Sequence, residues 1–356
     1  MLIYIIVFTL TTVLGFVIDN YKKRGGKKGV NIIYLLLFFI FVALVGFRDV
    51  SVGSDSYSYL LSFELAKDLS LLEYLTVNLF SDPGFYTFTW LVQDVSGNIN
   101  VYFLIITCFY FATYLKFISK YSSSSGWSVW ILNSLGFTTF AMSTLRQAMA
   151  MSFCLIAYML WVDRKKISWL FLLIACTFHL SALIYTPMMF VRSISKDRKP
   201  WKLVGIIIIT MLFTPFIMNY LMSVGYKGDR YAEASNVGGI GMIIMLLVFV
   251  VIGLFTYYPK RRDIPDTYYY ELVAVGFALC SFLVTRFNMA AMRLFWYFLS
   301  FTMIFVPNVL SKMKPYYKVI WSVGIAIITF YYLFFRVMDS PYDEGRLLLP
   351  YKFFWE

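Results

Sequence analysis

The chain has 356 residues, of which 60% are hydrophobic, 21% are aromatic and only 14% are charged, and its mean hydropathy is +0.73. This composition excludes a soluble globular protein, and recurring apolar runs of about 17 to 25 residues predict an all-α polytopic integral membrane protein. The net charge of +12 does not indicate a nucleic-acid partner, because basic connections on the cytoplasmic side of a membrane account for it.

About ten spanning helices are expected within a single transmembrane domain that covers residues 1–356. The first is predicted to be retained, because the N-terminus has no basic region and no small-residue cleavage site. The predicted spans lie near residues 1–18, 30–46, 101–118, 127–142, 148–162, 201–223, 239–258, 267–285, 294–310 and 318–335. The basic connections, expected to face the cytoplasm, are YKKRGGKKG, FISKYSSSSG, DRKK, RSISKDRK, PKRRD and KMKPYYK.

An external loop is predicted at about residues 47–100, and its apolar piece FSDPGFYTFTWLVQDV is short enough to lie in the membrane interface. The loop begins with GFRDVSVGSDSYSYL, which carries Asp55 as a candidate catalytic carboxylate and Arg48, Tyr57 and Tyr59 as candidate sugar-binding residues. Carboxylates accept hydrogen bonds from sugar hydroxyls, and tyrosines offer flat apolar faces. The alternative is that Asp55 pairs with Arg48 and merely shapes the loop.

The stretch STLRQAMAM begins a predicted helix, and Arg146 lies in its first turn. The N–H groups at a helix N-terminus together with an arginine form a good anion site, and the guanidinium can bond two phosphate oxygens at once. The alternative is an arginine that reaches toward a lipid headgroup at the membrane surface.

The stretch 167–191 holds His179, the one histidine of the chain. The asymmetry of lysines and arginines favours a helical hairpin that enters and leaves on the cytoplasmic side, with its bend near His179. There the imidazole can act as a general base toward a hydroxyl nucleophile. The alternative is a structural histidine that bonds a backbone carbonyl at the bend, with Ser181 as a further partner.

The stretch TRFNMAAMR places Arg286 and Arg293 seven residues apart, which is two helical turns and therefore one helix face. Two arginines that face one cavity suit a diphosphate, whereas one on lipid and one in a loop would have no such role. An external C-terminal tail is predicted at about residues 336–356.

Motifs for other chemistries are missing from the sequence. There is no Walker A loop, no Rossmann glycine fingerprint, no GxSxG and no cluster of histidines and cysteines with metal-ligand spacing. We therefore expect no metal and no cofactor, and an enzyme of this kind would need a donor that is already activated by a good leaving group.

The order of several motifs resembles the EpsG family, which groups with the Wzy-type polymerases of bacterial O-antigen, capsule and exopolysaccharide. The resemblance runs from about residue 47 to 352. It is carried by GFRDVSVGSDSYSYL, SDPGFYTFTWLV, STLRQAMAMSFCLIAYMLW, LIACTFHLSALIY, an RF with a following R…YF, and LPYKF. Its most specific part is the pair formed by RQ at Arg146 and Gln147 and FHLSA around His179.

The resemblance implies a glycosyltransferase of the bacterial cytoplasmic (inner) membrane, with a GT-C-like helical bundle and an outward-facing active site. Such enzymes transfer a growing glycan from undecaprenyl diphosphate to the next lipid-linked unit. The expected partners are the lipid-linked donor and acceptor and membrane lipid, and the resemblance also allows a chain-length regulator and a flippase. It implies functional roles for Arg146, Gln147 and His179, whereas Arg230, in a short external loop, is only a candidate for a loop-borne arginine.

Three other functions fit parts of the pattern. A flippase for lipid-linked oligosaccharides would also need a basic cavity, but it is expected to show internal repeats, and the sequence has none. A membrane acyltransferase that decorates the glycan would also need a histidine, with access to an acyl donor from the cytoplasm. A scaffold in an export complex would leave the external arginines unexplained.

Overall fold

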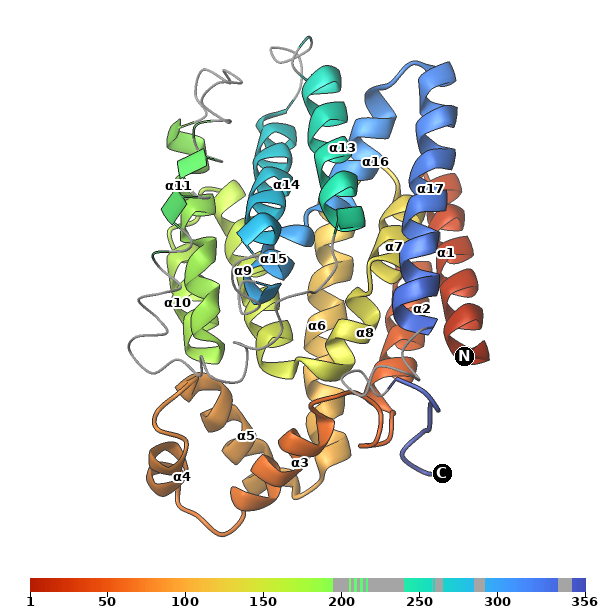
Figure 1. The fold of residues 1–356 in the computed structure, drawn as a ribbon. Helices are drawn as coiled ribbons and strands as arrows, with labels where there is room; N and C mark the ends of the chain where they lie inside the picture. The colour runs from red at the N-terminus through yellow and green to blue at the C-terminus, as the bar shows by residue number, and fades with distance from the viewer. Residues whose placement is uncertain are drawn as a thin grey trace. The chain divides into compact units, whose positions relative to one another are not determined.

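The computed structural model of the chain describes residues 1–194, 240–257, 265–284, 292–338 and 348–356, and a few isolated positions between 205 and 259. The regular elements in these ranges are all helices, so the predicted all-α polytopic membrane protein is confirmed (Figure 1). The helices form two compact units, Met1–Leu180 with Ser322–Glu356, and Ser181–Trp321, which are described separately. The prediction of a single domain and that of a GT-C-like bundle stay predictions.

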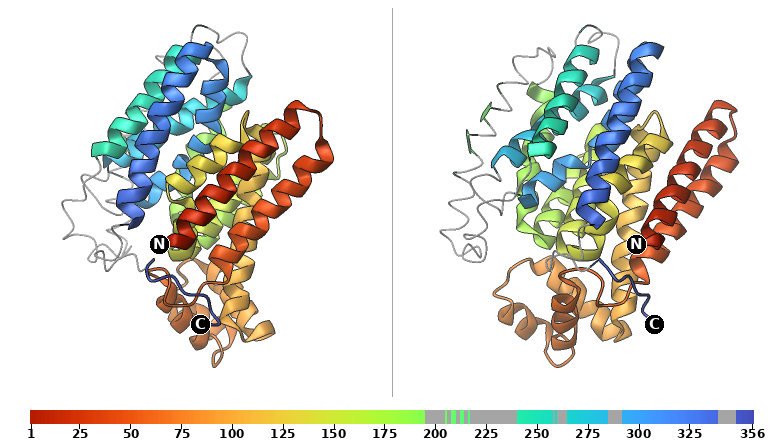
Figure 2. Two further views of the ribbon diagram at one scale, coloured as in Figure 1. Left: turned by 90° about the vertical axis from the view of Figure 1, so that its right-hand side faces the viewer. Right: turned by 45° about the vertical axis from the view of Figure 1, so that its right-hand side comes forward.

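The first unit is built on a row of apolar helices, each packed on the next: α1 on α2, α2 on α6, α6 on α9 and α9 on α10 (Figures 1 and 2). Their bounds are Leu2–Lys23 for α1, Lys27–Gly46 for α2, Ile99–Tyr121 for α6, Leu145–Val162 for α9 and Ser168–Phe178 for α10. The tight packing of α9 follows from its small buried residues, Ala148, Ala150, Ser152 and Ala157, because small side chains let membrane helices approach closely.

The predicted span at 127–142 is divided into α7 (Ser125–Ser134) and α8 (Phe137–Ser143). The division falls at Gly136, whose φ of 83° is a left-handed conformation that glycine adopts without steric cost. The chain then turns again at Thr144 and starts α9. These two breaks place the first turn of α9 at the end of the unit where the loop 47–100 lies (Figure 1).

The predicted loop at 47–100 folds into three helices, α3 (Ser56–Leu65), α4 (Leu71–Val77) and α5 (Pro83–Ser96). Ser70 and Glu73 form a capping box at the start of α4. An aromatic cluster that includes Tyr59, Phe63, Phe85 and Tyr102 joins α3 and α5 to α6. One face of α5 is therefore buried against protein, while Leu91 and Val95 on its other face stay exposed.

The end of the chain attaches to the start of this loop. The Asp49 N–H donates to the Lys352 carbonyl at 2.9 Å, and the Phe354 N–H donates to the Phe47 carbonyl at 3.0 Å. The described part of the predicted external tail thus lies on the same end of the first unit as the predicted external loop, as expected if both face one side of the membrane (Figure 2).

The second unit contains α11 (Thr186–Ile194), α13 (Ile240–Tyr257), α14 (Asp266–Val284), α15 (Met292–Leu299), α16 (Thr302–Lys312) and the start of α17 (Pro315–Met338). Helix α14 is central, because α11, α13, α15 and α16 all pack on it. Its fully buried Glu271 accepts two hydrogen bonds from the Asn308 amide of α16, at 3.0 and 2.9 Å. This pairing satisfies a carboxyl group that has no access to water.

Seven helices among the described residues are long and apolar enough to cross a membrane, compared with about ten predicted. The difference has three sources. The span at 127–142 is broken at Gly136, and 201–223 lies almost wholly outside the described residues. The span at 267–285 corresponds to α14, whose first turns carry Asp266 and Glu271.

In the hairpin region, α10 ends at Phe178 and a 3-10 helix starts at Leu180, so the predicted break at His179 is present. That the hairpin enters and leaves the membrane on the cytoplasmic side stays a prediction.

Candidate active site

A buried carboxylate, that of Asp82, joins three elements of the first unit. One oxygen of Asp82 accepts a hydrogen bond from Arg146 at 3.0 Å and lies 3.1 Å from His179 Nδ1. Its other oxygen accepts the Leu180 N–H at 3.2 Å. The start of α5, the first turn of α9 and the end of α10 therefore meet at this group (Figure 1). We call Asp82, Arg146 and His179 the carboxylate site.

The Asp82 side chain makes these contacts in place of the usual hydrogen bond that would cap its own helix. Asp82 is the N-cap residue of α5 and Pro83 follows at the first helical position, which is a common start for a helix. An N-cap aspartate usually accepts an N–H of its own helix, but Asp82 makes no such bond. Its φ of 43° is left-handed, a conformation that is strained for a non-glycine residue and often found at functional sites. The carboxylate is turned away from α5 and toward Arg146 and His179.

Gly84, the second residue of α5, allows α5 to approach the end of α10. A Cβ atom at this position would overlap the side chain of Thr177 and crowd Phe178. Since His179 follows directly, the missing side chain at Gly84 sets the distance between Asp82 and the imidazole.

We expect Gly84→Ala to separate α5 from α10 and reduce activity by about 100-fold, because a displacement of about 1 Å at a catalytic group can have that effect. The measurement is the catalytic rate beside the thermal midpoint. Gly241→Ala is the matched control, because a Cβ there meets nothing within 4 Å. Adding Thr177→Ala should restore part of the rate. Full activity of Gly84→Ala would show that the close approach is not needed.

His179 lies where α10 stops. Its backbone is extended, with φ −160° and ψ 117°, while its N–H still donates to the Ala175 carbonyl at 3.0 Å. The side chain keeps only 5% of its surface exposed. The Ser181 hydroxyl, predicted as a further partner of a structural histidine, is bonded to the Tyr297 hydroxyl at 3.0 Å. The imidazole's carboxylate partner is Asp82, so its orientation is fixed by a charged group.

Arg146 is the most accessible member of the carboxylate site. Its side chain is 27% exposed, compared with 7% for Asp82. It lies in the first turn of α9, where unpaired backbone N–H groups and the helix dipole add positive potential. Tyr59 of α3 lies beside Arg146. Burial raises the pKa of the Tyr59 hydroxyl, and the charge of Arg146 offsets only part of that, so this phenol stays neutral.

The electrostatics of the site favour a charged Asp82. Burial by itself would raise the pKa of this carboxyl group, but the hydrogen bond and charge of His179, the charge of Arg146 and the Leu180 N–H together lower it below 3.8. Asp82 is thus a carboxylate throughout the neutral range. In the part of the chain that the structure describes, no three His, Cys, Asp or Glu side chains gather as metal ligands.

The lowered pKa of Asp82 predicts a pH dependence of stability. A group whose folded pKa is depressed stabilises the fold above its unfolded pKa, and this contribution is lost as pH falls through the folded pKa. Between about pH 4 and that lower value, the wild-type protein should lose thermal stability more steeply than Asp82→Asn. Thermal midpoints of both proteins across this range test the linkage, and parallel curves would contradict it.

The family model of the EpsG family matches residues 31–353. The chain belongs to the EpsG family. Neither a curated protein nor a solved structure matches it. The matched range contains Asp82, Arg146 and His179, so the carboxylate site of this EpsG-family protein lies within the region that the family model matches.

Arg48, predicted to bind substrate, has a structural role in this EpsG-family protein. Its side chain is fully buried and donates to the carbonyls of Val45 at 2.6 Å, Met142 at 2.9 Å and Val52 at 3.2 Å. The guanidinium also lies over the Phe103 ring at 4.2 Å from its centroid. These contacts fasten the start of the loop to the junction of α8 and α9, which carries Arg146.

We expect Arg48→Ala to lower the free energy of unfolding by about 3 kcal/mol or more, because three carbonyls lose a charged donor and the buried side chain leaves a cavity. Ser56→Ala should cost about 1 kcal/mol, since the Ser56 hydroxyl bonds Val52 and Met142 carbonyls more weakly. Thermal unfolding in detergent measures both. A stable but inactive Arg48→Ala would instead support the predicted substrate contact.

The other predicted site residues are spread over the chain. Asp55 and Tyr57 lie exposed at the start of α3, and Gln147 is buried beside Arg146 on α9. Arg293 lies in the first turn of α15, in the second unit. Arg230 and Arg286 lie outside the described residues. The structure brings together Tyr59, Arg146 and His179, and it adds Asp82, which the sequence reading did not single out.

Proposed function

We propose that this EpsG-family protein polymerises undecaprenyl-diphosphate-linked oligosaccharide repeat units on the outer face of the bacterial cytoplasmic membrane. In this proposal the growing glycan passes from its lipid carrier to a sugar hydroxyl of the next lipid-linked unit. Membership of the EpsG family supports a polymerase-type role in polysaccharide synthesis. The observation that carries the mechanism is the pairing of the His179 imidazole with the buried Asp82 carboxylate beside Arg146.

This pairing suits general-base catalysis. A carboxylate 3.1 Å from Nδ1 favours the tautomer in which Nδ1 carries the hydrogen, so the lone pair is on Nε2. That nitrogen can take a proton from the acceptor hydroxyl, and Asp82 then stabilises the imidazolium that forms. His179 is the catalytic base in this scheme, and Asp82 is a positioning residue that acts through it.

The reaction step balances without a redox partner. The acceptor hydroxyl oxygen forms a bond to the anomeric carbon of the donor glycan, and the bond from that carbon to the diphosphate oxygen breaks. The hydroxyl proton goes to His179, and undecaprenyl diphosphate leaves with the electron pair. The leaving group is already activated, so the protein has to orient the reactants, accept one proton and stabilise the developing negative charge.

Arg146 is suited to the leaving diphosphate. It is the partly exposed member of the carboxylate site and lies at the positive end of α9. A guanidinium can bond two phosphate oxygens at once, and donors at a helix N-terminus add to the same field. Arg146 would therefore bind the donor's diphosphate and stabilise it as it leaves. Arg293, Arg286 and Arg230 remain candidates for further phosphate contacts.

Reconstitution tests the proposal directly. Purified protein in liposomes would receive the host's single-repeat lipid-linked glycan without any nucleotide sugar, and the products would be separated by size on a gel. We expect a ladder of chain lengths, lost in His179→Ala and Arg146→Ala. Arg24→Ala, an exposed arginine beyond the end of α1, is the control that should keep the ladder.

Other outcomes separate the alternatives. A single unchanged band from folded wild-type protein would count against polymerisation, and movement of the lipid-linked unit across the same liposomes would then support a flippase. A ladder that survives His179→Ala would keep the function and give His179 a structural role. If His179 is the base, its protonation lowers the wild-type rate at acidic pH. The residual rate of His179→Gln should then no longer fall as the pH is lowered.

A further inference from the structure

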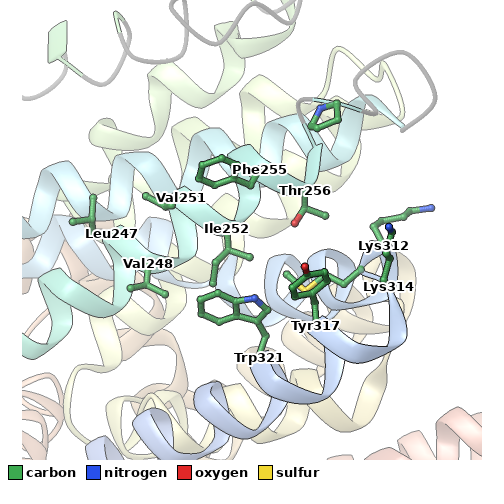
Figure 3. A pocket seen from close by; sticks show the side chains of 12 residues that line it. Leu247, Val248, Val251, Ile252, Phe255, Thr256, Lys312, Lys314, Tyr317 and Trp321 are labelled. Atoms are coloured by element: carbon green, nitrogen blue, oxygen red, sulfur yellow. The ribbon is translucent and has the colours of Figure 1, made fainter.

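The second unit has an apolar groove that the proposed reaction does not use. It has a volume of about 700 Å³ and lies between α13 and the junction of α16 with α17. One wall is formed by aliphatic and aromatic residues of α13, and the other by the first turns of α17, including Tyr317 and Trp321 (Figure 3). We call it the α13–α17 groove. Its volume falls in the range of ligand sites, about 300–1,000 Å³.

Positive charge is confined to one end of this groove. Lys312, the last residue of α16, and Lys314, just before α17, lie together there, while Leu247 and Val248 line the other end (Figure 3). Lys312 Nζ is held over the Tyr268 ring, 5.5 Å from its centroid. Helix α17 begins at this end, while α13 and α16 end there, so the positive potential comes from the two lysines.

The groove has the length of one lipid leaflet. Its wall on α13 runs from Leu247 to Thr256, which is roughly 14 Å at 1.5 Å per residue. Half of a bilayer's hydrocarbon core is about 15 Å thick. Phe255 on this wall is 79% exposed and Leu247 is 49% exposed, so the groove opens sideways. Tyr317 lies near the charged end, as aromatic residues commonly do at membrane interfaces.

We infer that the α13–α17 groove binds an anionic phospholipid of the cytoplasmic leaflet. The phosphate lies on Lys312 and Lys314, and an acyl chain lies along α13. The charged end carries the connection KMKPYYK, which the distribution of basic residues predicts to lie on the cytoplasmic side. Anionic headgroups are attracted there by about 1 kcal/mol per lysine. A longer polyprenyl chain would exceed a groove of one-leaflet depth.

Native mass spectrometry of the full-length protein tests this inference with phosphatidylglycerol and phosphatidylcholine as probes. We expect phosphatidylglycerol to bind preferentially and Lys312→Gln with Lys314→Gln to weaken it about 30-fold. Lys27→Gln with Lys28→Gln, which removes two exposed charges from the first turn of α2, should leave binding unchanged. Val251→Trp, which fills the groove, should also abolish the preference, whereas Ile244→Trp, exposed on α13 outside the groove, should not.

Each remaining outcome overturns the inference. Equal binding of both lipids would mean that the groove holds ordinary bulk lipid only. Sensitivity to the lysine pair without sensitivity to Val251→Trp would place the headgroup on the surface and leave the groove empty. Stronger binding of a polyprenyl phosphate than of phosphatidylglycerol, lost in the same variants, would identify a different occupant. Glycan extension in the Lys312→Gln, Lys314→Gln protein reports separately on the proposed polymerase.

Discussion

Replacing Asp82 with asparagine is expected to slow glycan extension by about 10²- to 10⁴-fold while the protein remains folded. An amide is neutral, so in the proposed mechanism it would no longer stabilise the imidazolium that forms when His179 takes the acceptor's proton. Its NH₂ group can also donate to Nδ1, which would place the hydrogen of the imidazole on the nitrogen that has to act as base. The side chain keeps its size, so the junction of α5, α9 and α10 keeps its packing. The measurement is the rate of ladder formation at saturating lipid-linked glycan.

The control for this substitution is Asp94→Asn on the same helix. Asp94 is exposed and makes none of the contacts of the carboxylate site, so its removal should leave the rate within a factor of two or so. Binding of the lipid-linked glycan should change little in Asp82→Asn, because Asp82 touches His179 and Arg146 and is itself almost wholly buried. A folded Asp82→Asn protein with the wild-type rate would remove the carboxylate from the mechanism and leave it as a link between helices.

The sequence shows where the helices of the first unit lie because their signals are local. Helices α1, α2, α6 and α9 are continuous apolar runs, and the stretch STLRQ marks the start of α9 through residues within one turn of it. The break at His179 is also readable, since a polar residue interrupts an otherwise apolar stretch. These features depend on neighbours in the chain, and a single sequence displays them directly.

The contacts of the carboxylate site, in contrast, join residues that are far apart in the chain. Asp82 reaches Arg146 across 64 positions of the chain and His179 across 97. Locally, SDPG has the pattern of a helix start, in which aspartate caps the helix and proline follows. Only the left-handed backbone and the missing cap bond distinguish it, and neither is visible in the letters. The available signal was the presence of SDPGF among the motifs that resemble the EpsG family.

Arg48 and Arg146 show why charge alone does not separate a structural arginine from one proposed to bind the diphosphate. Both follow apolar runs at helix ends, and both were predicted to bind substrate. The difference lies in tertiary packing, because Arg48 is fully covered and bonded to three carbonyls while Arg146 keeps a quarter of its surface exposed. Burial of this kind depends on which helices meet, which the sequence does not specify locally.

Removing the guanidinium at Arg146 is expected to have the other large effect, a loss of about 10²- to 10³-fold in the rate of extension for Arg146→Ala, as for other groups that stabilise developing negative charge. Unlike Asp82→Asn, this variant should also bind the lipid-linked glycan more weakly, because Arg146 is proposed to touch the diphosphate in the ground state as well. Arg146→Lys keeps the charge but loses the two-pronged geometry, so its rate should fall between those of alanine and wild type.

Measuring both the extension rate and the binding of undecaprenyl diphosphate shows whether Arg146 binds the diphosphate or mainly neutralises Asp82. Titration of undecaprenyl diphosphate, the proposed product, against each variant measures the diphosphate contact without any turnover. We expect weaker binding in Arg146→Ala, partial recovery in Arg146→Lys and near-normal binding in Asp82→Asn and His179→Ala. If Arg146→Ala binds the product as tightly as wild type does and loses thermal stability instead, the arginine serves mainly to neutralise buried Asp82. The diphosphate must then be held by other cations, for which Arg293 of α15 is the first candidate to replace.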